Sequence, residues 1–180
     1  MNGEKYLEII SQPMDKLMKE QIKKELERLQ EDADYSQKGH FAAASIFGYV
    51  HFALGIIASI LSFIAVSIIL IDPTKLKAVA FLSLFAGILT VISTFVNPDK
   101  RKKEHLKAGN LYLSLRNDAR IFNNTKLDQL EDAKASEHLD KLNKERNQLN
   151  CDMPQIPGWA FRKARKNIED GQLEYKTDKN

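Results

Sequence analysis

The stretch Phe41–Ile71, FAAASIFGYVHFALGIIASILSFIAVSIILI, decides how this chain folds. No Asp, Glu, Lys or Arg occurs between His40 and Asp72. About 20 helical residues cross the ~30 Å hydrocarbon core of a bilayer, so the run is longer than one crossing needs. We expect residues 50–71, its most apolar part, to span a membrane. The Ala- and Ser-rich start should extend the same helix into the membrane interface.

A second uncharged run, Ala78–Asn97, reads AVAFLSLFAGILTVISTFVN and has the length of one crossing. Only Asp72–Lys77 separates the two runs. Pro73 disfavours a helical conformation in the residue before it, so the first helix should stop at this point. The runs therefore predict an antiparallel transmembrane hairpin, with the parts of the chain on either side of it facing the same compartment.

A basic cluster, Lys100, Arg101, Lys102 and Lys103, comes directly after the second run and Pro98. Basic residues beside a membrane span favour the cytoplasmic side. The connector contains only Lys75 and Lys77 as cations. We therefore predict a multi-pass protein of the plasma membrane with both termini in the cytoplasm. The cluster should also attract the anionic headgroups of membrane lipids.

Each uncharged run carries small or weakly polar residues at steps of three and four. In the first run these are Ala44, Gly48, His51, Gly55, Ala58, Ser62 and Ala65, and in the second Ala80, Ser83, Gly87, Thr90, Thr94 and Asn97. Such stripes commonly let two membrane helices approach closely. The alternative is that part of a stripe lines a water-filled path in an oligomer, for which Thr90, Thr94 and Asn97 are the most polar candidates. His51 is ionisable but lies near the end of its span, which favours a structural or interfacial role.

The rest of the chain has the periodicity of amphipathic helices, over residues 13–37, 105–122, 127–149 and 159–175. We expect three parts: a cytosolic helix in 1–40, the hairpin in 41–97 and a helical region in 98–180. The predicted fold is all-α, with the flanking cytosolic helices forming a small bundle. Its seam, closing within the chain or between subunits, is assigned to Tyr112, Leu115, Phe122, Phe161, Ile168 and Tyr175.

No catalytic constellation is apparent, so we do not expect an enzyme. The four histidines are scattered, Cys151 is the only cysteine, and no phosphate-binding loop or hydrolase motif occurs. We expect no metal and no cofactor. A net charge of +3 is too weak an excess to indicate a nucleic-acid partner. The first apolar run also begins too late to be predicted as a cleaved leader.

The order of these features resembles the SLATT family of bacterial two-transmembrane effectors. The similarity rests on the amphipathic lead-in, the tight hairpin, and the two stretches 105–116, HLKAGNLYLSLR, and 160–175, AFRKARKNIEDGQLEY. The resemblance implies a homo-oligomer that forms a pore in, or disrupts, the inner membrane during bacterial conflict or antiviral defence. It also implies a nucleotide second messenger or a sensor protein as the trigger. The alternative is a non-conducting, membrane-anchored helical scaffold for a cytosolic partner.

The membrane hairpin has one direct test, extraction with alkaline carbonate. A protein that crosses the bilayer twice should stay in the membrane pellet, because its apolar runs are held by the hydrophobic effect rather than by charge. The competing interpretation is a pair of core helices in a soluble bundle. Release of the protein into the carbonate supernatant would support that interpretation and contradict the hairpin.

Overall fold

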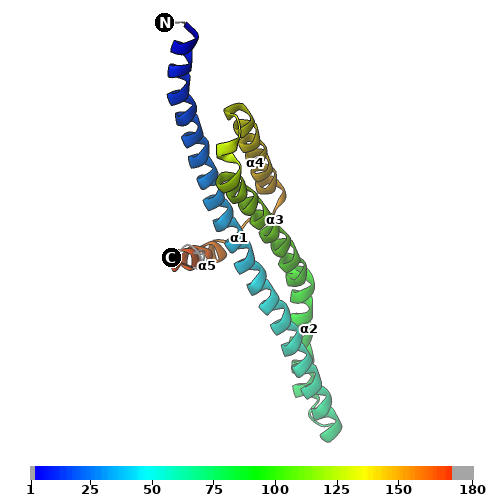
Figure 1. The fold of residues 1–180 in the computed structure, drawn as a ribbon. Coiled ribbons are helices and arrows are strands. Elements are labelled where there is room, and N and C mark those ends of the chain that lie inside the picture. The colour runs from blue at the N-terminus through cyan, green and yellow to red at the C-terminus, as the bar shows by residue number, and fades with distance from the viewer. Residues whose placement is uncertain (1–2, 172–180) are drawn as a thin grey trace. The chain divides into compact units, whose positions relative to one another are not determined.

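A computed structural model describes the backbone of residues 3–171 and the side chains of residues 16–171. The elements are α1 (Gly3–Ile71), α2 (Leu76–Val96), α3 (Pro98–Thr125), the short 3-10 helix η1 (Leu127–Gln129), α4 (Asp132–Asp152) and α5 (Gly158–Glu169) (Figure 1). Over residues 3–171 there is no β-strand. The predicted all-helical class is therefore confirmed for the described chain.

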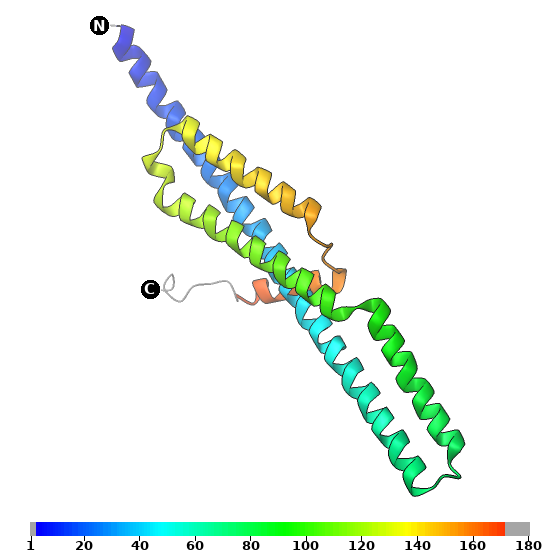
Figure 2. The ribbon, with the colours of Figure 1, turned by 90° about the vertical axis from the view of Figure 1, so that its right-hand side faces the viewer.

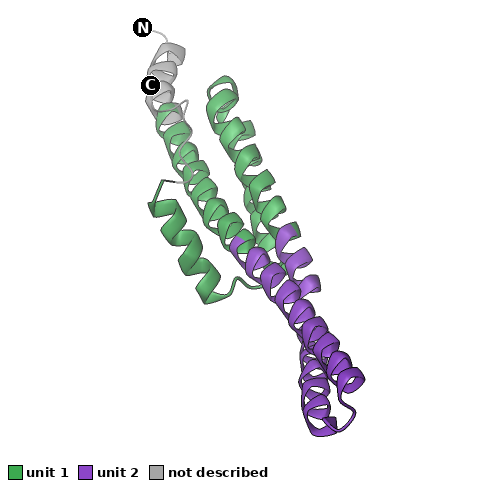
Figure 3. Ribbon diagram, turned by 90° about the horizontal axis from the view of Figure 1, so that it is seen from below, with its two compact units in different colours: residues 1–41, 107–180 green, residues 42–106 purple. Residues whose placement is uncertain are grey.

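Two compact units make up the chain, and Figure 3 distinguishes them by colour. Unit 1 contains residues 1–41 and 107–180, and unit 2 contains residues 42–106. Helices α1 and α3 each contribute residues to both units. The sequence predicted boundaries between residues 40 and 41 and between residues 97 and 98. The two units divide between residues 41 and 42 and between residues 106 and 107.

Helix α1 runs without a break from the amphipathic segment into the apolar run. Gly39 lies at this transition, and glycine in a helix interior costs about 1 kcal/mol relative to alanine. The contact with Ile156 requires glycine at this position, because a Cβ at Gly39 would lie only 2.9 Å from Cγ2 of Ile156. Gly39 therefore lets the connection between α4 and α5 approach the backbone of α1.

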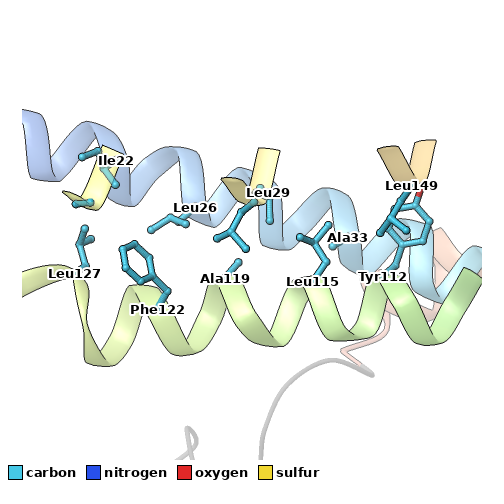
Figure 4. Close-up of a cluster of buried hydrophobic side chains, with 12 residues drawn as sticks. Ile22, Leu26, Leu29, Ala33, Tyr112, Leu115, Ala119, Phe122, Leu127 and Leu149 are labelled. Carbon is cyan, nitrogen blue, oxygen red and sulfur yellow. The ribbon is translucent and has the colours of Figure 1, made fainter. Parts of the chain in front are cut away.

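The core of unit 1 is one cluster of buried side chains at helical spacing (Figure 4). Its members are Ile22, Leu26, Leu29 and Ala33 of α1, Tyr112, Leu115, Ala119 and Phe122 of α3, Leu127 of η1, and Ala135, Leu142 and Leu149 of α4. Figure 4 shows the α1 and α3 side chains pointing toward one another. The seam residues Tyr112, Leu115 and Phe122 thus close on the same chain, and little of their surface is left for a neighbouring subunit.

In unit 2 the last part of α1 and the whole of α2 run side by side (Figure 2). The turn between them is held by Asp72, whose Oδ1 accepts hydrogen bonds from the backbone N–H of Thr74 (3.0 Å) and from its hydroxyl. At the other end of α2, Asn97 has φ of 44° and ψ of 60°. Asparagine tolerates this left-handed conformation better than most residues. Its N–H donates to the carbonyl of Ser93, and its Oδ1 accepts from the N–H of Lys100, so Asn97 caps both α2 and α3.

Most of the large apolar side chains of unit 2 are exposed. Phe63 is 75% exposed, Leu70 78% and Phe95 85%. In the most apolar stretch of each helix only 6% of the residues are buried within the chain, whereas the core helix of a soluble protein is mostly buried. Both helices are long and apolar enough, by length and composition, to cross a membrane. The prediction of two long apolar helices is confirmed.

One close contact inside unit 1 can be tested by adding a single methyl group. A Cβ at Gly109 would lie 2.5 Å from Cε1 of Phe41. Gly109→Ala should therefore destabilise the protein by about 1–3 kcal/mol through overpacking. The measurement is the thermal midpoint of the detergent-purified protein, followed by circular dichroism.

The control for this substitution is Gly55→Ala, because a Cβ at Gly55 meets nothing within 4 Å. In a Phe41→Ala background, Gly109→Ala should cost less than it does in the parent, because the ring that meets the new methyl group is gone. A Gly109→Ala protein that melts like the parent would contradict the packing described for this contact.

Candidate functional site

The two apolar helices touch through small side chains. Ala65 is the only buried residue in residues 50–71, and Ala86 is the only one in α2. Alanine at a helix contact allows the two backbones to approach closely. The bulky Ile, Leu and Phe side chains around this contact are left at the surface of the helix pair.

A groove of about 380 Å³ lies along this contact. Its lining consists of Ser62, Ala65, Val66 and Ile69 from α1 and Val79, Ser83, Ala86, Gly87 and Thr90 from α2. The groove thus brings together five residues of the predicted stripes: Ser62, Ala65, Ser83, Gly87 and Thr90. It does not include the other stripe residues, among them Gly48, His51, Gly55, Thr94 and Asn97. Ala65 is buried, and the other four residues that the groove brings together are exposed at the surface of the chain.

Three hydroxyl groups of the stripes, those of Ser62, Thr90 and Thr94, donate hydrogen bonds within their own helices. Ser62 donates to the carbonyl of Ala58 and Thr90 to that of Ala86, each at 2.9 Å. Thr94 donates in the same way to the carbonyl of Thr90. This pattern satisfies the donor without a partner on the facing helix. Each hydroxyl oxygen keeps acceptor capacity for a further group.

Two glycines of the stripes have open space where a side chain would be. A Cβ built at Gly55 or at Gly87 meets nothing within 4 Å. Glycine is also the poorest helix former after proline, by about 1 kcal/mol relative to alanine. Packing within this chain therefore gives no reason for glycine at either position. Both residues present bare backbone on the outside of the helix pair.

Where α1 meets the start of α3, unit 2 carries a cluster of aromatic and basic groups. The ring of Phe47 stacks on His105, with centroids 5.5 Å apart, and the guanidinium of Arg101 lies 5.7 Å from the Phe47 centroid. Gly48 leaves room for the stem of Lys102, whose Cδ would lie 3.4 Å from an added Cβ. Burial lowers the pKa of His105, although Glu104 opposes the shift, and Arg101 acts in the same direction as burial.

The remaining cations of the basic cluster form exposed ion pairs along α3. Lys103 pairs with Asp99 at 2.6 Å and Lys100 with Glu104 at 3.8 Å. Both lysine side chains are at least 70% exposed. Exposed pairs of this kind contribute about 0–1 kcal/mol each. Other anions can therefore replace Asp99 and Glu104 as partners of these lysines at little cost in free energy.

Unit 1 contains a polar layer that the sequence did not predict. Arg116 and Asp34 form an ion pair at 2.9 Å, with side chains only 11% and 14% exposed. Desolvation raises the pKa of the Asp34 carboxyl, although Arg116 opposes the shift. Beside it, the hydroxyl of Tyr112 donates to Oδ1 of Asn150 (2.7 Å), and His40 stacks on the Tyr112 ring.

A pocket of about 590 Å³ opens next to this layer. It is lined by Asp32, Tyr35 and Ser36 of α1, Tyr112 of α3, Arg146 and Asn150 of α4, and Phe161 and Arg165 of α5. Tyr35 and Phe161 stack with centroids 6.0 Å apart. Arg146 pairs with Asp32 at 3.0 Å. Aromatic rings beside guanidinium groups suit a planar ligand that carries negative charge.

Two of the predicted seam residues lie on α5, and they are more exposed than Tyr112, Leu115 and Phe122 of α3. Phe161 is 44% exposed and Ile168 is partly buried. The buried residues of α5 are Ala160 and Ala164. Tyr175, the third predicted seam residue in this part of the chain, lies outside the described residues.

No family model, curated protein or solved structure matches the chain. Among residues 16–171, no three or more His, Cys, Asp or Glu side chains are grouped so that they could hold a metal ion.

The buried pair of unit 1 generates a stability prediction. Asp34→Ala should lower the free energy of unfolding by about 3 kcal/mol, because Arg116 would keep its charge in a poorly hydrated place. Asp32→Ala is the matched control: it removes the partner of Arg146, but the Asp32 side chain is 63% exposed, so we expect about 0–1 kcal/mol. Chemical denaturation in detergent measures both. Equal losses for the two variants would show that burial of the pair has no energetic consequence.

Proposed function

We propose that this chain is a two-span protein of the bacterial inner membrane whose copies assemble into an oligomer that permeabilises that membrane. The spans form a hairpin, both termini lie in the cytoplasm, and unit 1 is the cytosolic helical bundle. The biological role is that of an effector in conflict or antiviral defence. One observation carries the proposal: a groove with Ser62, Ser83, Gly87 and Thr90 in its lining, on a helix pair whose exposed large side chains are mainly Phe, Ile and Leu.

Two features of the helix pair favour assembly: open backbone at two glycines and hydroxyl oxygens that can accept further hydrogen bonds. Gly55 and Gly87 present open backbone, which a neighbouring helix can approach closely. The hydroxyl oxygens of Ser62 and Thr90 keep acceptor capacity that lipid tails cannot satisfy. A second hairpin, or a water-filled path between hairpins, would satisfy them. One hairpin cannot enclose a path through the membrane, so permeabilisation requires several copies.

The trigger belongs to unit 1. The pocket with Tyr35, Phe161, Arg146 and Arg165 on its walls has a volume typical of small-molecule sites. Rings and guanidinium groups together match the base and the phosphates of a nucleotide second messenger. A sensor protein acting on the bundle is the other trigger that the proposal allows.

The second candidate is a non-conducting, membrane-anchored scaffold for a cytosolic partner. It is favoured by the internal hydrogen bonds of Ser62, Thr90 and Thr94, whose donors need no water. In this case the groove would serve helix packing alone.

Substitution of the open glycines tests assembly directly. Gly87→Leu and Gly55→Leu should leave each hairpin folded, because the new side chains enter empty space, but should block close approach of a neighbour. We expect the oligomer to be lost in chemical cross-linking and native mass measurements. Leakage of dye from liposomes, and of ions from expressing cells, should fall with it.

The matched control is Ala53→Leu, on the face of α1 opposite Gly55 by helical spacing and also exposed. An unchanged oligomer in both glycine variants would sink the proposed interface. Intact membranes with the parent oligomer present, under triggering conditions, would favour the scaffold. Thr90→Val with Thr94→Val separates the uses of the groove: reduced leakage from an intact oligomer indicates a wet path, and unchanged leakage indicates packing.

A further inference from the structure

Helix α5, Gly158–Glu169, concentrates positive charge in a short segment. Its sequence GWAFRKARKNIE contains Arg162, Lys163, Arg165 and Lys166 and only one acid, Glu169. Arg165 pairs with Glu169 at 2.8 Å, both side chains being exposed. The other three cations therefore form an excess of positive charge that the acid of this helix does not neutralise.

One face of α5 is fixed on α1 within unit 1. Ala160 and Ala164 are fully buried, and small residues of this kind allow close helix contact. Ile156, just before the helix, occupies the space left by Gly39 of α1. Phe161 stacks on Tyr35, one helical turn earlier in α1. These contacts determine which face of α5 is left outward.

The outward face combines the cations with the only tryptophan of the chain. Trp159, Arg162, Lys163 and Lys166 lie at spacings of three, four and seven residues, which places them on one side of a helix. All four are exposed, Trp159 by 38%. Lysine and arginine beside tryptophan is the composition of helices that lie on a membrane surface. The indole suits the interface because it has both an apolar ring and a polar N–H.

We propose that this outward face of α5 is a contact surface for anionic lipid headgroups. The inference rests on the proposed membrane location of the chain. The surface is cationic, as an anionic bilayer requires. The turn of α1 to which α5 is fixed, residues 35–39, is followed in the sequence by the uncharged run that begins at Phe41. A lipid surface thus accounts for the charge, for the exposed indole and for the packing of α5 against the segment of α1 that directly precedes the uncharged run.

Trp159 reports on its own surroundings, since no other tryptophan contributes to the emission. The full chain is reconstituted into nanodiscs of phosphatidylcholine alone or with added phosphatidylglycerol. We expect a blue-shifted emission maximum, and quenching by brominated phosphatidylglycerol, only in the anionic discs. The triple variant Arg162→Gln, Lys163→Gln, Lys166→Gln should give the neutral-disc spectrum in both. The control, Lys134→Gln, Lys141→Gln, Lys144→Gln, removes three exposed cations of α4 and should behave like the parent.

The outcomes separate this inference from the proposed function. If the chain does not incorporate into discs, the membrane location fails and the lipid surface fails with it. If it incorporates but Trp159 emits identically in neutral and anionic discs, the lipid surface alone is overturned. An equal blue shift on adding heparin to neutral discs would assign the face to an acidic macromolecule and would also overturn the lipid surface.

Discussion

Two helices whose apolar side chains are not buried by their own chain set the main constraint on this protein. Residues 50–71 and α2 carry no charged residue apart from Lys77 in the first turn of α2, and most of their Phe, Ile and Leu side chains are exposed. In the membrane location proposed for these helices, every polar group that faces lipid must find a partner close by, because the hydrocarbon core holds no water. The hydroxyls of Ser62, Thr90 and Thr94 accordingly donate to their own helices. Asp72 and Asn97 meet the same need at the ends, where the backbone leaves the helical pattern.

The all-helical class and the two long apolar helices could be predicted because they depend on local pattern alone. Absence of charge over a sufficient length identifies the apolar runs, and Pro73 and Asn97-Pro98 end them where the sequence indicates. The spacing of Tyr112, Leu115 and Phe122 predicted a buried face, because apolar residues at steps of three and four lie on one side of a helix. What it packs against is a tertiary property, and here it is α1 of the same chain.

Features that depend on two distant segments could not be predicted. The role of Gly39 requires knowledge of Ile156, and the pairing of Asp34 with Arg116 joins two residues that look like ordinary surface positions in the sequence. Neighbouring residues on a helix differ by about 100° in direction, so a stripe read from spacing can be displaced sideways by one residue. In α2 the buried residue is Ala86, next to Gly87 of the predicted stripe, and in α5 Ala160 is buried next to Phe161 of the predicted seam.

The ion pair between Asp34 and Arg116 also determines how unit 1 can move. Each residue directly follows a core position, Ala33 on α1 and Leu115 on α3. Sliding one helix along the other by a single turn, about 5.4 Å, would carry the two charges apart while both stayed poorly hydrated. The pair therefore pins the axial register of α1 against α3 and opposes piston-like displacement. Rotation or bending that keeps the pair together costs less than sliding.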